Sequence, residues 1–585
     1  MAQLPIANGI ATTLACADIL PHRYPRQRHV AMARSNLSPS CPRRQIAQGQ
    51  SFQSHCLHCA KSATYWLARA LVMQRTLSVS AERTPLRQRV LNRVAATTVT
   101  PGALVAVVAA LQAVVWTVTP ALINFAPPLD VVESYMWGRE WVLATYKHPA
   151  MPSWVLEASR VLAGGAVGWP AYLASQLFIA TTFALVFVFG RDIMGSRRAA
   201  AGVLLLAALP AYTWLSPEFN HNIAMLPFWA GVVMALWRAV ERGSTPWWMA
   251  VGAFAAGGLY AKFTTVTLLL AAAGWILWDP KARRSLATPG PWLGLAVFAV
   301  ITAPIAIWLV EHRYAPLAYV SERTKLGRDP HLQPFLWGSL ANFLAVVVGL
   351  WFAGLLTQRQ RTVSSKSTTL SPRSLRYMGV LLFGPLLLTL VVASATSSGL
   401  RSAWSNSMFN LAGIFAVGLL SERVDEGALK RLVRFVVALV VLFPLGYAAV
   451  FGPFFIYTPS KVPRVQWPQA EITDRFQSLW SAATGGLPLR IVAGRSWAAG
   501  LVGLTAPARP SILNGGRLDW SPWVSQERID REGMLIVWDG PDAKLPPALA
   551  PYRGRQPSGT EHFKVPGNSS EIDIHWIVVP PKPGS

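Results

Sequence analysis

DVVESYMWGR (residues 130–139) and YKHPAMP (residues 146–152) stand between two apolar runs, residues 103–123 and 170–190. Two carboxylates, Asp130 and Glu133, are three residues apart and share one face if this segment is helical. Acidic side chains are costly in hydrocarbon, so acids at the edge of a membrane are candidates for function. The segment therefore predicts a membrane protein whose chemistry lies where an outward loop meets the bilayer.

The composition supports a membrane protein. Of the 585 residues, 52% are hydrophobic and only 14% are charged, whereas a soluble chain carries roughly a quarter charged residues. The 25 tryptophans fit the same class, because aromatic rings favour the two membrane interfaces. We expect a polytopic α-helical membrane protein.

The formal net charge of +26 does not indicate nucleic-acid binding. Much of the basic surplus adjoins apolar runs or lies in the N-terminal extension, where it sets membrane topology and contacts anionic lipid. No nucleic-acid recognition motif accompanies it. Nucleic acid is excluded as a partner.

Residues 1–95 are predicted to form a disordered, basic N-terminal extension. They contain all four cysteines of the chain, at positions 16, 41, 56 and 59. The single CxxC has the spacing of a metal site, but without a second pair this is a weak signal. Met73 is an alternative start, so residues 1–72 need not belong to the mature protein, although an arginine-rich beginning also resembles a transit peptide. We assign this region no function.

Apolar runs recur through a membrane domain that we place at residues 96–456. They predict about eleven spans, near residues 103–123, 170–190, 199–216, 222–238, 247–261, 263–278, 291–310, 334–357, 377–396, 405–421 and 432–456. Several are shorter than the roughly 20 residues that cross hydrocarbon. The fifth and sixth runs are also compatible with one bent hairpin, so the count carries an uncertainty of one or two.

The loops predict the orientation of these spans. Arginines and lysines follow the second, fourth, sixth, eighth and tenth runs, which places those loops in the cytoplasm under the positive-inside rule. The outward loops are then 124–169, 217–221, 311–333 and 397–404, and the tail is also outside. Loop 311–333 is basic against this trend; its cations either hold phosphate or contact lipid headgroups.

The tail, residues 457–585, is predicted to be a small α/β domain in the periplasm. Apolar runs at residues 489–494 and 534–538 are typical of short buried strands, and residues 497–504 of a helix between them. No phosphate-loop or dinucleotide motif occurs in the tail. Packing or positioning of an acceptor is favoured there over chemistry.

Asp130 and Glu133 are the predicted catalytic pair. In an inverting glycosyl transfer one carboxylate removes the acceptor's proton while the acceptor attacks the sugar. The second carboxylate would hold the acceptor, a cation or a divalent metal ion, so metal dependence stays open. The structural alternative is that Asp130, which follows two prolines, caps a helix running through Trp137.

Further polar residues in the outward loops are predicted to bind substrate. Each has a plain alternative: a solvated turn, an ordinary loop, a lysine reaching the bilayer surface, or an aromatic anchor at the interface. A cation beside a leaving phosphate stabilises its growing charge, and an aromatic ring stacks on a sugar. The candidates are Lys147, His148, Glu218, Asn220, His221, Lys262, Arg401 and Trp404.

The order of these motifs resembles a known family. Asp-x-x-Glu, Lys-His-Pro, Glu-Phe-Asn, Ala-Lys-Phe and Arg-x-x-Trp follow one another through residues 100–545 as in the bacterial polyprenyl-phosphate-sugar glycosyltransferases. That group belongs to glycosyltransferase family 39 in the broad sense. It is related to the protein O-mannosyltransferases and the lipid A aminoarabinose transferases, and it has the GT-C fold. This chain departs at Ala150, where relatives often have a second proline.

The resemblance implies an inner-membrane enzyme with its active site at the periplasmic face. Asp130 would be the base, with Glu133 beside it, and Lys147, His148 and Arg401 would bind the donor phosphate. We expect an inverting transfer of a hexose or pentose from a polyprenyl phosphate to an envelope acceptor, lipid A or lipopolysaccharide, another glycolipid, or protein. The alternative is a transporter or flippase of lipid-linked sugars, which predicts inverted repeats and ionisable residues at mid-membrane.

Overall fold

The computed structural model of the protein describes residues 100–324, 331–357, 370–452, 462–540 and 545–582. Contacts divide the chain into two units, Met1–Thr97 and Thr98–Ser585, and all described residues belong to the second. The predicted N-terminal extension, Met73 and the four cysteines lie outside the described residues.

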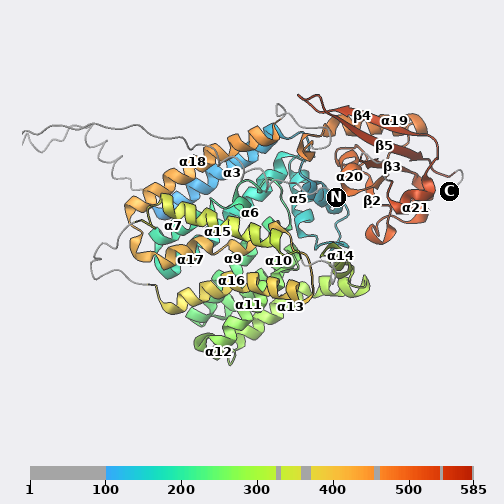
Figure 1. Cartoon of the computed structure of the whole chain (residues 1–585). Coiled ribbons are helices and arrows are strands. Elements are labelled where there is room, and N and C mark those ends of the chain that lie inside the picture. The colour runs from blue at the N-terminus through green and yellow to red at the C-terminus, as the bar shows by residue number, and fades with distance from the viewer. Residues whose placement is uncertain (1–99, 325–330, 358–369, 453–461, 541–544, 583–585) are drawn as a thin grey trace, which may run out of the picture. The chain divides into compact units, whose positions relative to one another are not determined.

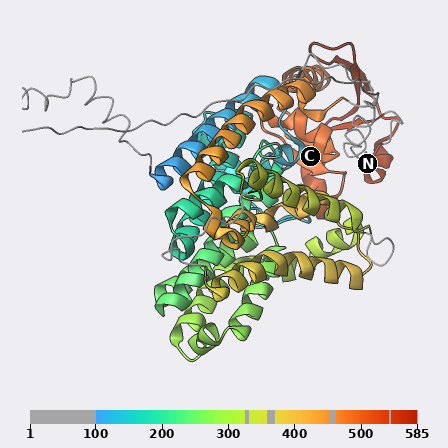
Figure 2. The ribbon, with the colours of Figure 1, turned by 60° about the vertical axis from the view of Figure 1, so that its left-hand side comes forward.

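Each predicted apolar run contains a helix, and two of the runs are helical over only part of their length. In Figures 1 and 2, α3 and α18 lie side by side, and α6 packs against α3. The helices of this part are α3 (Pro101–Ile123), α6 (Trp169–Met194), α7 (Ser196–Leu206), α9 (Leu226–Arg242), α10 (Thr245–Ala261), α11 (Thr265–Trp278), α12 (Pro280–Ser285), α13 (Pro289–Glu311), α15 (Gln333–Phe352), α16 (Pro372–Ala395), α17 (Ala412–Leu419) and α18 (Glu426–Phe451).

The helices confirm a multi-pass membrane protein but do not confirm eleven spans. Within the described residues, seven helices are long and apolar enough to cross a membrane: α3, α8 with α9 as His221–Arg242, α6, α13, α15, α16 and α18. The run at 199–216 is helical only to Leu206, because Pro210 removes a backbone donor and disfavours helical geometry at the residue before it. The run at 405–421 yields only the short helix α17.

The short helices α7 and α17 pack against each other. Every residue of α7 from Ala199 to Leu206 is buried. The two helices approach so closely that a Cβ on Gly413 would lie 2.0 Å from the carbonyl oxygen of Gly202. Small residues permit such contact between helices in membranes. α7 is therefore short and buried along its length from Ala199, whereas α17 is short and buried on the side that faces α7 but exposes Leu419.

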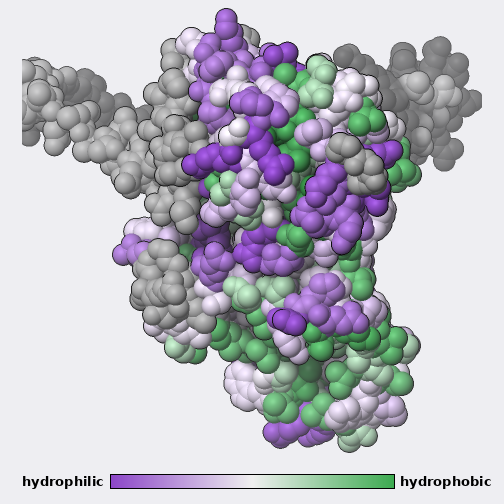
Figure 3. Space-filling model, turned by 90° about the vertical axis from the view of Figure 1, so that its right-hand side faces the viewer, coloured by the Kyte–Doolittle hydropathy of each residue, from purple (hydrophilic) through white to green (hydrophobic). Residues whose placement is uncertain are grey.

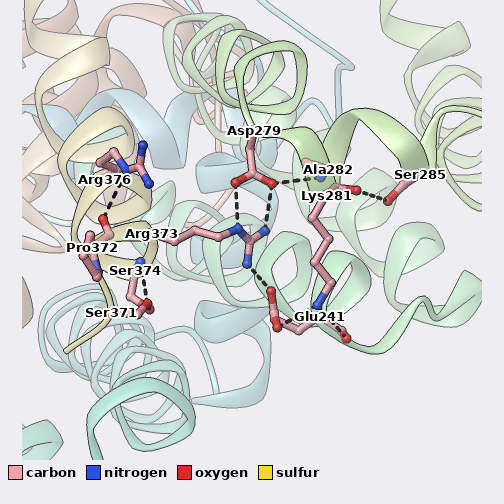
Figure 4. A network of polar contacts seen from close by, with 10 residues as sticks. All are labelled: Glu241, Asp279, Lys281, Ala282, Ser285, Ser371, Pro372, Arg373, Ser374 and Arg376. Atoms are coloured by element: carbon pink, nitrogen blue, oxygen red, sulfur yellow. Dashed lines mark hydrogen bonds and ion pairs between the residues drawn. The ribbon is translucent and has the colours of Figure 1, made fainter. Parts of the chain in front are cut away.

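Basic and acidic residues from several helix ends meet at one end of the helical part (Figure 4). Arg373 of α16 donates two hydrogen bonds to Asp279, at 2.6 and 2.9 Å, and also pairs with Glu241, which Lys281 contacts at 2.9 Å. Asp279 also caps α12 by accepting from the amide of Ala282. The structure thus joins at one end three of the five loops that the sequence predicts to be cytoplasmic, those after the fourth, sixth and eighth runs.

Replacing Arg373 with methionine is expected to destabilise this end. The substitution leaves the Asp279 carboxylate, 9% exposed, without its guanidinium. Because Arg373 is partly exposed, we expect a loss of about 2 kcal/mol in the free energy of unfolding, below the roughly 3–5 kcal/mol of a fully buried pair. Thermal unfolding in detergent, followed by tryptophan fluorescence, measures it.

Arg376→Gln is the matched control. Arg376 lies one turn further along α16 (Figure 4) and makes no ion pair within the described ranges. Its substitution should change the free energy of unfolding by less than about 0.5 kcal/mol. Equal losses for the two variants would contradict the role given to Arg373.

Shorter elements lie at the other end of the helical part. They are α4 (Leu129–Gly138), α5 (Met151–Leu162), η1 (Pro210–Tyr212), α8 (His221–Ala224), α14 (Ala315–Thr324), η2 (Ser402–Trp404) and η3 (Asn406–Phe409). One further short element, η4 (Ser421–Arg423), does not belong to this group. Backbone hydrogen bonds join their loops: Gly399 donates to Thr324, and Phe125 to Val465. The loops predicted to face outward therefore meet one another.

The C-terminal part is a five-stranded sheet with helices, and its strand-helix-strand core confirms the predicted α/β class. The strand order is β2-β1-β3-β5-β4; β1 pairs in parallel with β2 and β3, and β5 pairs antiparallel with β3 and β4. Its elements are η6 (Arg464–Gln466), α19 (Gln469–Thr484), β1 (Ile491–Gly494), α20 (Ser496–Leu504), β2 (Ser511–Asn514), η7 (Leu518–Trp520), α21 (Gln526–Glu532), β3 (Met534–Asp539), η8 (Pro547–Tyr552), β4 (Ser558–Lys564) and β5 (Glu571–Val579).

This sheet domain packs directly on the first outward loop. Helix α20 contacts α4 so closely that a Cβ on Gly500 would lie 2.5 Å from Val132. Arg509 donates to both carboxylate oxygens of the buried Glu157, at 2.7 and 2.8 Å. In Figure 3, hydrophilic residues gather over the upper part of the face shown and hydrophobic residues over the lower part. This pattern fits a sheet domain in water on helices in lipid.

Candidate active site

Helix α4 places Asp130 in its first turn. Pro128 is the N-cap residue, and no side chain caps the helix. The alternative in which Asp130 caps the helix is therefore wrong. Its carboxylate instead lies near the positive end of the helix dipole, which favours the charged form, and it is free to bind groups from another loop.

Asp130 meets the loop that precedes α8. The Asn220 Nδ2 atom donates to Asp130 Oδ2 at 3.2 Å, across 90 residues of sequence. The Asp130 amide in turn donates to Glu218 Oε1 at 3.1 Å. The second wall expected from Glu218 and Asn220 thus contacts the first outward loop directly.

Asn220 is oriented by the helix that it caps. Its side-chain oxygen accepts from the amides of Asn222 and Ile223 at 2.9 and 3.3 Å. Because that oxygen is engaged by the backbone, the NH2 group is left to face Asp130. Capping of α8 therefore fixes one hydrogen-bond donor to the candidate base.

The two carboxyl groups have perturbed acidity. Burial raises the pKa of Asp130, although the Lys147 charge opposes this shift. Burial and the Asp130 carboxylate raise the pKa of Glu218 to about 8. Adjacent carboxyl groups resist ionising together, so Glu218 keeps its proton near neutral pH while Asp130 is the better base.

Glu133, one turn after Asp130, forms an ion pair with Lys147. The Nζ and Oε2 atoms are 2.6 Å apart, and Glu133 is only 6% exposed. Burial disfavours the charge of Lys147, but the carboxylates of Glu133 and Asp130 outweigh it and raise the lysine pKa. Lys147 therefore stays a cation, 5.9 Å from the ring centres of Trp137 and Tyr319.

Lys147 stands in a tight hairpin. Ala144 and Pro149 form a β-bridge, and the Thr145 amide donates to the carbonyl of His148 at 2.9 Å. The Thr145 hydroxyl oxygen accepts from the amides of Lys147 and His148. These bonds restrict the hairpin without the second proline that relatives often carry.

The two histidines pack together beneath this hairpin. The ring centres of His148 and His221 are 4.1 Å apart, and His221 Nε2 contacts the carbonyl oxygen of Pro149 at 3.1 Å. Burial, the facing His221 and the Lys147 charge lower the pKa of His148 well below its usual value. A neutral imidazole offers a hydrogen bond to a phosphate rather than a charge.

One alternative for Lys262 was that its side chain reaches the bilayer surface, and the structure contradicts it. It is 6% exposed, and its Nζ donates to Asn222 Oδ1 at 2.5 Å. The same atom lies 5.7 Å from the ring centre of Trp404. Lys262 and Trp404 thus form one pair, joined through Asn222 to the loop that contacts Asp130.

Arg401 is exposed and stands outside this contact network. Burial of part of its side chain and the neighbouring charge of Arg323 lower its pKa. Arg323 lies on α14, in the outward loop whose basic character is unexpected for that side. Arg323 and Arg401 are therefore two exposed arginines whose like charges interact.

Asn222 belongs to the polar cluster of the Glu218 loop, which the sequence predicts to be a wall of the site. Other residues of the site were not predicted. Tyr319 lies in an outward loop as an isolated aromatic residue, which carries little signal. Tyr146 precedes a recognised motif, and Trp520 lies in the tail.

Within residues 100–582, apart from the gaps stated above, no three His, Cys, Asp or Glu side chains are placed to hold a metal ion. The CxxC pair lies outside the described part.

Comparisons with known proteins identify the fold. Residues 147–308 match the family model described as dolichyl-phosphate-mannose-protein mannosyltransferase. The structure is similar to ArnT from Cupriavidus metallidurans bound to undecaprenyl phosphate, with a TM-score of 0.55, 16% identity and coverage of 81% of this chain and 97% of that chain. The structure of ArnT in the apo state has a TM-score of 0.48 and 19% identity, with coverage of 81% of this chain and 97% of that chain. The Archaeoglobus fulgidus oligosaccharyltransferase in the apo form has a TM-score of 0.36 and 10% identity, with coverage of 74% of this chain and 69% of that chain.

Among curated proteins, none matches the chain. At 16% identity the ArnT structure with undecaprenyl phosphate establishes a common fold, and the mannosyltransferase model covers the Lys147 hairpin, the Glu218 loop and Lys262. The resemblance inferred from the motifs is confirmed. This chain is a multi-pass membrane protein with the GT-C fold, and its residues 147–308 match the mannosyltransferase family model.

Proposed function

We propose that this chain is an inverting glycosyltransferase that moves one sugar from a polyprenyl phosphate to an envelope acceptor at the periplasmic face of the inner membrane. One observation carries the proposal. Asp130, a partly buried carboxylate of raised pKa, lies one helical turn from the Glu133–Lys147 ion pair. A base and a fixed cation side by side are what transfer from a phosphate requires.

The reaction uses these groups in opposite roles. Asp130 removes the proton of an acceptor hydroxyl while that oxygen attacks the anomeric carbon of the sugar from the side opposite the phosphate. A new C–O bond forms, and the bond to the phosphate oxygen breaks. The electron pair leaves on the phosphate, so the products are the glycosylated acceptor, with inverted configuration, and polyprenyl phosphate.

Lys147 faces the charge that develops on the leaving phosphate. Glu133 keeps Lys147 protonated and oriented through the 2.6 Å contact, so we assign Glu133 to Lys147 rather than to proton removal. Lys262, Arg323 and Arg401 add positive charge on the same side of the protein. Preformed cations in a site that excludes water stabilise such a transition state strongly.

The membrane domain explains how the donor reaches these residues. An isoprenoid tail dissolves in the bilayer, and its sugar phosphate then enters from the edge at which the outward loops meet. Among acceptors we favour an envelope glycolipid, such as lipid A or lipopolysaccharide, over protein, because the Lys-His-Pro motif is similar to that of enzymes that decorate lipopolysaccharide.

Transfer from doubly labelled donors tests the function. The purified protein in liposomes receives polyprenyl phosphates that carry one label on the sugar and another on the prenyl chain, together with envelope lipid extracts. We expect the sugar label in an acceptor lipid and the prenyl label in free polyprenyl phosphate. Movement of intact donor across the bilayer, with both labels still joined, would instead support a flippase.

The pH dependence of transfer is expected to report Asp130. A base must be ionised, so kcat/KM falls as the pH falls through its pKa. Since burial raises the Asp130 pKa, this loss should begin above the value of about 4 for an exposed aspartate. The charge of Lys262 lowers the Asp130 pKa. In Lys262→Met the fall of kcat/KM at low pH, the acid limb of the profile, should therefore begin at a still higher pH.

Lys281→Met is the control for this shift, because Lys281 lies at the opposite end of the helical part and pairs with Glu241. It should leave the acid limb in place. An acid limb that stays unchanged in Lys262→Met, or moves to lower pH, would argue against Asp130 as the titrating base.

A further inference from the structure

Tyr146 stands at the tip of the Lys147 hairpin and is almost completely enclosed. It is 6% exposed. Three aromatic rings surround it: Trp137 at 6.3 Å and Tyr319 at 5.6 Å, both edge-on, and Trp520 stacked at 4.1 Å with an interplanar angle of 1°. These rings come from α4, α14 and the sheet domain, so Tyr146 is the point at which three separate elements meet.

The sheet domain holds Tyr146 by a hydrogen bond as well as by the stack. Asn514 Nδ2 donates to the Tyr146 hydroxyl oxygen at 2.8 Å, across 368 residues of sequence. Asn514 is itself fixed, because its side-chain oxygen accepts from Ser496 Oγ and its backbone amide donates to Ser521 Oγ. A donor held by its own partners orients the group that it contacts.

Trp520 is not available as a platform for a sugar. Its ring is stacked on Tyr146, and the Arg517 guanidinium lies 4.3 Å from its ring centre. Arg517 is held in turn by the carboxylate of Asp519. Trp520 is partly exposed, but Tyr146 and Arg517 occupy its ring, so we assign its contribution to Tyr146 rather than to substrate.

The neighbour of Tyr146 in the chain is the candidate phosphate ligand. Lys147 has a flexible four-carbon stem, and its Nζ lies 5.9 Å from the rings of Trp137 and Tyr319. The same two rings pack against Tyr146. A displacement of Tyr146 would thus move both the backbone that carries Lys147 and the aromatic walls around its ammonium group.

We propose that Trp520 and Asn514 of the sheet domain are positioning residues that hold Lys147 at the donor phosphate by fixing Tyr146. The inference deepens the proposed function and rests on it. It assigns to the sheet domain a part in donor binding, although its side chains named here do not touch the phosphate. Donor affinity then depends on the docking of a domain more than 300 residues away in sequence.

Substitutions of Trp520 in the full chain, reconstituted in nanodiscs, test this. Trp520→Ala should raise the donor KM and weaken binding of unlabelled polyprenyl phosphate by about tenfold, the upper range for loss of an aromatic pair. The acceptor KM should not change. Trp520→Phe should recover most of the affinity, since a phenyl ring still stacks on Tyr146. Asn514→Ala should raise the donor KM in the same direction.

Arg475→Gln is the matched control, because it breaks an ion pair of the sheet domain, with Glu561, that does not involve Tyr146. It should leave both KM values unchanged. A purely structural role for Trp520 would lower kcat through a smaller folded fraction and would leave the donor KM as it is. That result, or equal donor affinity in wild type and Trp520→Ala, would overturn the inference.

The measurement of polyprenyl phosphate binding distinguishes a failure of the proposed function from a failure of the positioning role. A wild type that binds polyprenyl phosphate but transfers no sugar would defeat the proposed function. Weaker binding in Trp520→Ala would still support positioning in that case. A wild type that transfers sugar, with variants of unchanged donor affinity, would defeat the positioning role alone.

Discussion

Asp130→Asn is expected to reduce kcat for sugar transfer by about 10²–10⁴-fold, the contribution of a positioned general base. Asparagine preserves the size of the side chain and its contact with Asn220, but it cannot accept the proton of the acceptor hydroxyl. The structure predicts little change in folding, since burial already disfavours the Asp130 charge. Initial rates with a labelled donor, beside the thermal midpoint, measure both quantities.

Glu218→Gln is the matched variant within the same cluster. Burial and the Asp130 charge raise the Glu218 pKa to about 8, so glutamine imitates the protonated form that prevails at neutral pH. Its backbone contact with Asp130 can be retained. We expect a rate within about tenfold of wild type, well short of the 10²–10⁴-fold loss for a base. The reverse ranking would transfer the role of base to Glu218.

Lys147→Met is expected to have the second large effect, on both stability and rate. It leaves the Glu133 carboxylate, 6% exposed, without its partner, which should cost about 3–5 kcal/mol in the free energy of unfolding. It also removes the cation beside the leaving phosphate, with an expected loss of about 10²–10³ in kcat by analogy with removal of a transition-state donor. Thermal unfolding and transfer rates measure the two effects separately.

The double variant Glu133→Gln/Lys147→Met separates these effects. Without the buried carboxylate, most of the stability should return, because no uncompensated charge remains. The rate should stay low, because no cation faces the phosphate. Recovery of the rate together with the stability would show that Lys147 acts only by neutralising Glu133.

The arrangement of helices was largely predictable because hydropathy records where lipid replaces water. Every predicted apolar run contains a helix. Hydropathy cannot distinguish a span from a short helix buried among other helices, and α7 and α17 are of this second kind. Their lengths depend on Pro210 and on the close approach of Gly202 to Gly413, which are features of packing.

The site was predictable where its residues lie in loops that the sequence places on the same side of the membrane. Asp130, Glu218 and Asn220 were expected at one membrane edge, and the structure joins them by hydrogen bonds. The details were not predictable. A capping role for Asp130 was compatible with the prolines before it, but Asn220 binds its carboxylate instead, and nothing local to Asp130 indicates this.

The contacts of the sheet domain with the Lys147 hairpin left no sequence signal. The tail was expected to serve packing or acceptor positioning, and Trp520 and Asn514 lie far from Tyr146 in sequence. Their contact depends on how the sheet packs against α4, through Gly500 and Val132. Spacing rules apply within one helix or strand and do not reach such pairs.

Transfer in detergent solution tests the central claim most directly, because no membrane is present to transport across. The purified wild type and Asp130→Asn receive the doubly labelled donor and an envelope lipid extract. The wild type should release equal amounts of glycosylated acceptor and free polyprenyl phosphate, and Asp130→Asn should release almost none. A donor that remains intact with the wild type in detergent, while the same protein moves it across liposome bilayers, would contradict the account.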